Sequence, residues 1–282
     1  MRNDIENFIS RDDFNLKGIC YLDHAGTTLP SKQLLKDVFE ELSTQNMGNP
    51  HSFGEFSNFS NMVISAARDM VLSSINAESS QYSVLFTSGA TESCELVAES
   101  FPWSKKSVYC YPMCAHTSVL GIRHFADNVL SLPTTSFRHS GLNVAHKQNC
   151  VHQLNDIGHY NLVTVAGESN FCGYKADLNY MSELFARRSM STWMNLQEDR
   201  NVVAGDITDE TLAGEWLWLL DAAKLMATSP FDISSLPEKG RPHFIALSFY
   251  KIFGYPSGLG ALLVRRDVSH LLQKRYFQQT LA

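Results

Sequence analysis

The sequence lacks the cysteine spacing of a metal site or a disulfide framework. Its six cysteines include no pair separated by two residues and are scattered along the chain, at Cys20, Cys94, Cys110, Cys114, Cys150 and Cys172. Cys110 and Cys114 are close in sequence, but no second pair of Cys or His residues completes the spacing typical of a zinc site. We therefore expect free thiols and no metal centre.

A strongly basic surface is also missing. The chain has 23 Lys and Arg residues against 29 Asp and Glu residues, which gives a formal net charge of −6. Proteins that bind nucleic acid carry a basic patch, so this balance argues against nucleic acid as a partner. The sequence has neither a signal peptide nor an apolar run of about 18 residues. We therefore expect no membrane contact and a soluble, cytoplasmic protein with reduced thiols.

Apolar residues are present in sufficient number for a sizeable core. Of the 282 residues, 44% are hydrophobic and 18% are charged, which permits one large core or two modest domains. The sequence shows no internal repeat, low-complexity tract or clear linker.

Apolar, strand-like runs alternate with amphipathic segments along the chain. This alternation is typical of an α/β fold in which a mostly parallel sheet is flanked by helices. The expected strands span residues 83–87, 107–111, 162–166, 215–220, 243–248 and 261–265, and the expected helices span 34–42, 63–75 and 92–100. Two polar stretches, residues 134–149 and 189–214, fit neither pattern and are expected to form surface loops or insertions.

Two polar residues at the ends of expected buried strands indicate the chemistry of a site. Asp221 closes the apolar run 216–220, and Lys251 follows the run that begins at residue 246. Open α/β sheets bind ligands at their strand ends. An acid and a lysine suit pyridoxal phosphate, because the amine can form a Schiff base while a carboxylate keeps the pyridine nitrogen protonated. The same pair, taken alone, also fits a helix-capping Asp and a solvated Lys.

The segment 86–93 lies between an expected strand and an expected helix, where it can hold a phosphate. Gly89 permits the turn, and the amides of Ala90 and Thr91, together with the Thr91 hydroxyl, can point at an anion. The helix dipole favours negative charge at that position. An ordinary capping box, Thr or Ser followed by Glu, explains the same residues.

Three more polar residues follow expected strands. His116 can stack on a flat ring, although a single His is more often a satisfied polar group. Asn170 can hydrogen-bond a ring hydroxyl, although turn chemistry explains Asn170 and Gly173 equally well. Ser248, three residues before Lys251, can reach a phosphate.

Taken in order, these segments resemble the class-V, fold-type-I pyridoxal-phosphate enzymes related to cysteine desulfurases. Residues 87–93 are nearly the desulfurase phosphate-loop motif, and residues 248–251 match the family's Ser-x-His/Tyr-Lys motif. The resemblance implies that Lys251 is the catalytic residue that carries the Schiff base. It implies cofactor-binding roles for Ala90 and Thr91 at the phosphate, His116 on the ring, Asn170 at the ring hydroxyl, Asp221 at the pyridine nitrogen, and Ser248, Tyr250 and Lys251. Lys224 stands where desulfurases often have a Gln that contacts the ring hydroxyl.

Finer detail resembles the amino-terminal domain of the molybdenum cofactor sulfurases. Tyr250, rather than His, before the lysine is typical of that branch. The segments that carry this resemblance are 21–30, 48–52, 116–119, 169–171 and 248–264. It runs from about residue 7 to residue 277 and implies a single domain over residues 1–282 that binds pyridoxal phosphate, with its core at about 20–268.

The resemblance implies a sulfurtransferase of the cysteine-desulfurase type. Its substrate is L-cysteine, and its sulfur acceptor is the molybdenum cofactor or the molybdoenzymes xanthine dehydrogenase and aldehyde oxidase. Lys251 is the natural shuttle for the proton that leaves the substrate Cα, and a protein cysteine thiolate then attacks the substrate sulfur. In related dimers a loop that binds phosphate comes from the neighbouring subunit, so a homodimer is among the assemblies that the resemblance allows.

The chain departs from that family at its end. It stops at Ala282, without the small domain, the MOSC domain and the persulfide cysteine of the family, so we expect a truncated form that is inactive alone. Cys94 and Cys172 lie within the cofactor motifs and are interpreted as buried structural thiols. Two alternatives stay open: another class-V activity, such as a selenocysteine lyase or an aminotransferase, and a truncated chain without catalysis.

Overall fold

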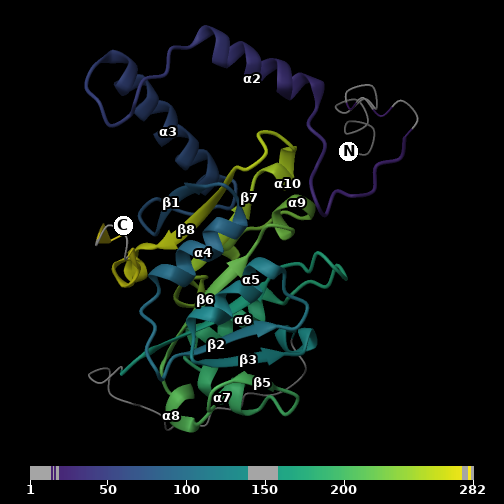
Figure 1. The fold of residues 1–282 in the computed structure, drawn as a ribbon, viewed down its shortest axis with the longest axis vertical. Helices are drawn as coiled ribbons and strands as arrows, with labels where there is room; N and C mark the ends of the chain where they lie inside the picture. Colours follow the sequence, from purple (N-terminus) through teal and green to yellow (C-terminus); the bar gives the residue numbers. More distant parts are fainter. Residues whose placement is uncertain (1–13, 15, 17–18, 139–157, 275–278, 281–282) are drawn as a thin grey trace.

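The computed structural model describes residues 14, 16, 19–138, 158–274 and 279–280. In this part of the chain an eight-stranded sheet forms the centre, with helices on both faces (Figure 1). The strands are β1 (Tyr82–Thr87), β2 (Val108–Pro112), β3 (Asn128–Leu132), β4 (Tyr160–Ala166), β5 (Asn201–Ala204), β6 (Glu215–Asp221), β7 (Phe244–Ser248) and β8 (Gly260–Arg265). The α-helices are α2 (Lys32–Thr44), α3 (Glu55–Ser73), α4 (Ala90–Ser100), α5 (Thr117–Gly121), α6 (Leu178–Ala186), α7 (Met190–Asn195), α8 (Asp209–Leu212), α9 (Leu225–Thr228) and α10 (Tyr250–Phe253). Short 3₁₀ turns and a two-stranded ribbon complete the described chain: η2 (Ile122–Phe125), η3 (Thr134–Phe137), η4 (Ile233–Ser235), η5 (Glu238–Gly240), η6 (Arg266–Leu271), β9 (Gln273–Lys274) and β10 (Gln279–Thr280).

The order of strands across the sheet is β1-β8-β7-β6-β4-β2-β3-β5. The central strands β7, β6, β4, β2 and β3 run parallel to one another. β8 runs antiparallel between β7 and β1, and β5 pairs antiparallel at the far edge. Parallel neighbours need crossover connections, which the helices supply here. The predicted α/β fold with a mostly parallel sheet flanked by helices is confirmed.

The sheet is buried on both faces, as strand β6 shows. Trp216, Trp218 and Leu220 belong to one apolar core, and Leu217 and Leu219 belong to the other. This division follows from the strand geometry, since successive side chains point to opposite faces. Residues of α6 and α7 line the first core and residues of α4 and α5 line the second, so each face of the sheet has its own helical layer (Figure 1).

Helices α2 and α3 form an N-terminal arm that projects from the sheet (Figure 1). None of the residues of α2 is buried. Only the C-terminal end of α3 reaches the core, where Val71 and Leu72 are buried beside β1. The arm is therefore attached to the sheet at the end of α3, while α2 lies outside the packed layers.

The predicted strands all exist, with bounds that differ by no more than two residues from those expected. Helix α3 begins at Glu55, well before the predicted start at residue 63. Residues 189–214 were expected to form surface loops or insertions; the loop prediction is wrong, because this stretch contains α7, β5 and α8 and buries Met190, Trp193 and Met194. In the other polar stretch Phe137 is buried, and residues 139–149 lie outside the described residues. Among the described helices, none has the length and apolar character that crossing a bilayer would need.

Candidate active site at the carboxyl ends of the strands

The loops that follow β2, β4, β6 and β7 leave the sheet at one edge. These strands are neighbours in the order β7-β6-β4-β2 and run parallel, so their carboxyl ends lie together. Asp221 is the last residue of β6 and Ser248 is the last residue of β7. The sheet topology therefore places the candidate residues of four separate segments at one edge of the sheet, where open α/β sheets usually bind ligands.

Lys251 lies in the short helix α10, directly after β7, with only 6% of its surface exposed. Burial lowers the pKa of the Lys251 ammonium; the negative charge of Asp221 raises it in part, and the positive charge of Lys224 lowers it. A lysine amine in such surroundings loses its proton more readily than a solvated one, and the neutral amine is the nucleophilic form.

The pKa of Asp221 is shifted in the opposite direction to that of Lys251. Burial raises the pKa of the Asp221 carboxyl, while a hydrogen bond from the Ala223 amide and the positive charges of Lys251 and His116 lower it in part. The Ala223 amide donates to Oδ1 of Asp221 at 3.1 Å. Asp221, Lys251 and His116 thus share one electrostatic environment, and the structure brings these three predicted residues together.

The turn between β1 and α4 forms the second part of the site. The amide of Ala90 donates to the hydroxyl oxygen of Ser248 at 3.1 Å, which joins two predicted phosphate-binding residues that are far apart in sequence. Gly89 has a φ of 146°, and a Cβ atom added at this position would lie 3.5 Å from the ring of Tyr250. A residue with a side chain would be strained at this φ.

The turn between β1 and α4 also tests the alternative that residues 86–93 form an ordinary capping box. The carboxylate of Glu92 accepts a hydrogen bond from the amide of Ser88 at 2.5 Å, one residue before the N-cap, so the reciprocal bond of a capping box is not formed. The N-cap residue of α4 is Gly89, which supplies no side-chain cap. The first-turn amides of α4 therefore receive no side-chain acceptor from the N-cap position, as an anion site requires, although the Ala90 amide donates to Ser248.

His116 and Asn170 lie in the loops after β2 and β4, at the same edge of the sheet. His116 is the N-cap of α5, where its Nδ1 accepts a hydrogen bond from the Ser118 amide at 3.2 Å. Asn170 is half-buried in the turn that follows β4. Within the part of the chain that the structure describes, no hydrogen bond or ion pair joins the side chain of Asn170 or Thr91 to Lys251 or Asp221. Their cofactor-binding roles stay predictions.

The two cysteines of the motifs differ from each other. Cys94 is buried in α4, and burial holds the pKa of its thiol well above the usual range. Cys172 is exposed, so its interpretation as a buried structural thiol is wrong. The Asn170 turn faces outward at its tip, because the neighbouring Phe171 is also exposed. A motif alone does not reveal which of its residues turn outward.

Thr28 supports the lysine, and the sequence analysis gave this residue no role. Its hydroxyl donates to the backbone carbonyl of Lys251 at 2.6 Å, and its amide donates to the carbonyl of Tyr250 at 3.3 Å. Gly254 closes the lysine turn with a φ of 81°, and a Cβ there would lie 2.5 Å from the carbonyl oxygen of Thr28. The motif at residues 21–30 drew attention to this segment of the sequence. The contact itself joins Thr28 to Lys251, 223 positions later, and a local motif does not predict it.

Residues 20–192 match the class-V aminotransferase family. The chain belongs to this family. Its relatives include the molybdenum cofactor sulfurase of Arabidopsis thaliana, 36% identical over 93% of this chain and 32% of the relative. The human molybdenum cofactor sulfurase is 35% identical over 95% of this chain and 28% of the relative. The chain thus spans about a third of the length of the curated relatives it matches.

Solved structures show the same fold. A C-DES variant with glycine covalently linked to its PLP cofactor is 14% identical, with a TM-score of 0.65 over 94% of this chain and 61% of that chain. The cysteine desulfurase CsdA of Escherichia coli is 17% identical, with a TM-score of 0.58 over 93% of this chain and 59% of that chain. The predicted resemblance to the class-V, fold-type-I enzymes is confirmed at the level of family and fold.

Proposed function

We propose that this chain carries the cofactor site of a pyridoxal-phosphate-dependent sulfurtransferase of the cysteine-desulfurase type. The substrate is L-cysteine, and the sulfur is destined for the molybdenum cofactor or the molybdoenzymes that contain it. One observation carries the proposal: a buried lysine, Lys251, shares its electrostatic environment with Asp221 at the strand ends. The similarity to proteins named molybdenum cofactor sulfurase supports the choice of branch.

The residues present fit the cofactor. The N-terminus of α4, with Ala90 and Thr91 in its first turn, favours a phosphate, and the Ser248 hydroxyl lies within hydrogen-bond distance of the Ala90 amide. The desolvated carboxylate of Asp221 gains stability from a cationic partner, which a protonated pyridine nitrogen supplies. Lys251 provides the amine to which the cofactor aldehyde attaches.

The chain's own residues supply the proton chemistry. When bound, the cofactor provides an electron sink for the charge that develops at the substrate Cα. Lys251, with its lowered pKa, accepts the proton from that Cα and returns it. Thr28 holds the backbone of the lysine turn, while His116 and Asn170 orient the ring from the neighbouring loops. Tyr250 borders Gly89 and closes the phosphate turn.

Reductive labelling tests the attachment residue. The chain is incubated with pyridoxal phosphate, treated with borohydride and digested, and the peptides are mapped by mass spectrometry. We expect the pyridoxyl group on the peptide that contains Lys251, and none on that peptide in Lys251→Ala. Lys224→Ala is the matched control, because Lys224 is a second lysine close enough to affect the pKa of Lys251. Label on Lys224 in the unaltered chain would overturn the assignment.

Proton exchange tests the substrate. The loaded chain, in deuterated buffer, should replace the Cα hydrogen of L-cysteine with deuterium, which mass spectrometry of the recovered amino acid detects. The exchange requires only the cofactor and Lys251, so it measures this chain's residues apart from any later sulfur transfer. Lys251→Ala should lose the exchange and Lys224→Ala should retain it. Exchange that persists in Lys251→Ala would show that another group moves the proton.

A further inference from the structure

We propose that Cys114 and Cys172 form a dithiol site that reacts with low-molecular-weight disulfides and closes into an intramolecular disulfide. Cys114 lies in the loop between β2 and α5, and Cys172 lies in the turn between β4 and α6. β2 and β4 are parallel neighbours, so both loops leave the same edge of the sheet. The disulfide would tie the loop of His116 to the turn of Asn170.

The Ser169 hydroxyl lies between the two cysteines. It donates to the carbonyl oxygen of Cys114 at 3.5 Å, and it accepts from the amide of Cys172 at 3.4 Å. One oxygen atom thus bridges the two backbones. A disulfide requires Cα atoms about 4.4–6.8 Å apart, so the proposal requires the two loops, already joined through Ser169, to meet within that range.

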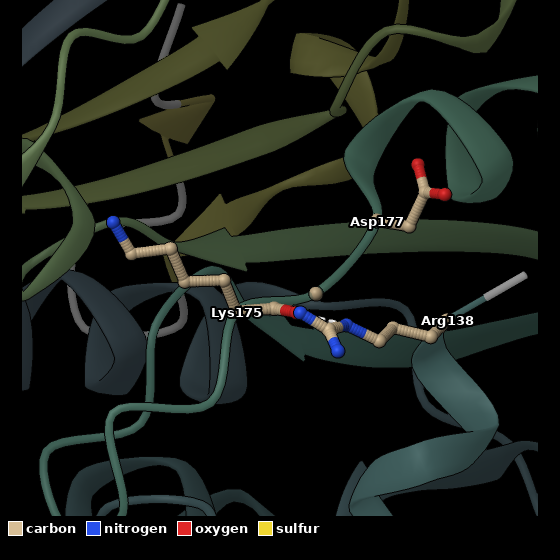
Figure 2. A pocket seen from close by; sticks show the side chains of 4 residues that line it. Arg138, Lys175 and Asp177 are labelled. Atoms are coloured by element: carbon tan, nitrogen blue, oxygen red, sulfur yellow. Dashed lines mark hydrogen bonds between the residues drawn. The ribbon is translucent and has the colours of Figure 1, made fainter.

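The turn that carries Cys172 is held in place by its own hydrogen bonds. The amide of Ser169 donates to the carbonyl of Tyr174 at 2.9 Å, and Glu168 pairs antiparallel with Lys175 at its base. Arg138 anchors the same base from outside: its Nε donates to the Lys175 carbonyl at 3.2 Å, and its guanidinium lies over the Tyr174 ring. Figure 2 shows the hydrogen bond from Arg138 to the Lys175 carbonyl. Both residues line a pocket of about 310 Å³. The turn therefore presents Cys172 at a fixed position.

Hydrogen-bond donors favour the thiolate form of Cys172. The pKa of the Cys172 thiol is lowered, first by a hydrogen bond from the Ser169 hydroxyl and then by the Tyr174 amide and the Cys114 thiol. All three groups donate to the thiolate form and stabilise it. The Ser169 hydroxyl has a single hydrogen, so it donates either to the Cys114 carbonyl or to the Cys172 sulfur. Cys172, which is exposed, is assigned as the attacking thiol, and Cys114, which is partly buried, as the resolving one.

The reaction is a pair of thiol–disulfide exchanges. The Cys172 thiolate attacks one sulfur of oxidised glutathione; that S–S bond breaks, and one glutathione leaves as its thiolate. The Cys114 thiol then loses its proton to solvent and attacks the Cys172 sulfur, and the second glutathione thiolate leaves. The two protein thiols are oxidised by two electrons, and one glutathione disulfide is reduced to two glutathione molecules.

The other described cysteines do not share these features. Cys94 and Cys110 are fully buried, and burial raises the pKa of both thiols. Cys20 is exposed like Cys172, which makes it an internal standard for reactivity. Because donors beside the Cys172 sulfur favour its thiolate, Cys172 should be alkylated by iodoacetamide before Cys20 near neutral pH. Faster alkylation of Cys20 would contradict the assignment of the attacking thiol.

The decisive experiment maps the disulfide in the chain without cofactor, so it is independent of the proposed enzymatic function. The protein is equilibrated with oxidised glutathione, quenched with N-ethylmaleimide and digested with trypsin without reduction. The peptide 107–123 contains Cys110 and Cys114, and the peptide 148–175 contains Cys150 and Cys172. We expect these two peptides to be cross-linked, with fragmentation placing the bond between Cys114 and Cys172.

Matched variants identify the reacting residue in each peptide. Cys114→Ser and Cys172→Ser should both lose the cross-link, whereas Cys110→Ala and Cys150→Ser, in the same peptides, should retain it. If a variant of the buried Cys110 folds poorly, fragmentation of the unaltered chain still distinguishes Cys110 from Cys114. Glutathione retained on Cys172 with Cys114 alkylated by N-ethylmaleimide would overturn the proposal, as would a cross-link through Cys20 or Cys150.

Discussion

Helices α2 and α4 were both predicted from the sequence, but they lie in different surroundings in the structure. α2 has 13 residues and buries none of them, whereas α4 has 11 residues and buries six. Leu35, Phe39 and Leu42 recur along α2 at helical spacing, yet all three are exposed. An amphipathic pattern therefore shows that a helix has an apolar face, but it does not show whether a given stretch of chain covers that face.

Helices α2 and α4 should also differ in how much they contribute to the stability of the fold. Apolar surface stabilises a fold only where it leaves water, at roughly 25 cal/mol for each Å². Helix α4 contributes to the core over β7 and β8, but α2 adds little to the stability of the sheet. Substitutions in the two regions can measure this difference.

The largest expected effect is that of a buried tryptophan. Trp218 in β6 is fully buried and stacks on Phe185 with ring centroids 5.2 Å apart. Trp218→Ala should lower the free energy of unfolding by about 3–5 kcal/mol, because it removes buried contacts and leaves a cavity. Phe39→Ala, in the exposed face of α2, should change it by no more than about 0.5 kcal/mol. Urea denaturation measures both; a large loss in Phe39→Ala would show that α2 is packed in solution.

A second effect concerns acid stability of the sheet. Burial, together with the positive charge of Arg265, holds the pKa of His243 well below its usual range, and its Nδ1 accepts from the Trp218 amide at 3.1 Å. The unfolded chain binds a proton as the pH falls below about 6.5, while the folded chain does not, so stability is lost on acidification. The slope is limited to about 1.4 kcal/mol for each pH unit, the value for one proton.

His243→Gln should therefore flatten the fall in stability below about pH 6.5, even if it lowers stability at neutral pH. His51→Gln is the control, because His51 is exposed in the loop between α2 and α3. Denaturation midpoints at a series of pH values provide the measurement. An unchanged acid slope in His243→Gln would mean that other groups cause the acid loss.

The smallest effect compares two helix caps. Ser31 accepts the Leu34 amide at 3.0 Å at the start of α2, and Asp177 accepts the Tyr180 amide at 3.0 Å at the start of α6. Asp177→Ala should lower the global free energy of unfolding by about 1 kcal/mol, because α6 is part of the core. Ser31→Ala removes an equivalent cap, but it should leave global unfolding unchanged and only increase amide exchange within α2. Equal global losses would contradict the separation of the two regions.

The sheet could be predicted from the sequence because its central strands are buried on both faces and read as continuous apolar runs. Strand β3 was missed, since Asn128 and Ser131 interrupt its run. Helix α7 was missed because it is too short to show a helical period, although Trp193 and Met194 are buried. A short element packed by tertiary contacts leaves little trace in local sequence.

The candidate site shows the same limit. Asp221 and Lys251 were found because each ends an apolar run, a local signal. The hydrogen bond from Thr28 to Lys251 and the position of Cys172 at the tip of an outward turn could not be found in this way. Both depend on how distant segments approach one another. The residues that do the chemistry were easier to predict than the residues that hold or surround them.

Thr28 gives the arm and the site a common element. The hydrogen bonds that hold the Lys251 turn belong to the segment from which α2 departs. By thermodynamic reciprocity, any free-energy coupling that these hydrogen bonds carry between the segment and the lysine turn is equal in both directions. The exposed arm and the buried amine of Lys251 would then be energetically coupled through this segment. A perturbation at either end should be detectable at the other without a direct contact between them.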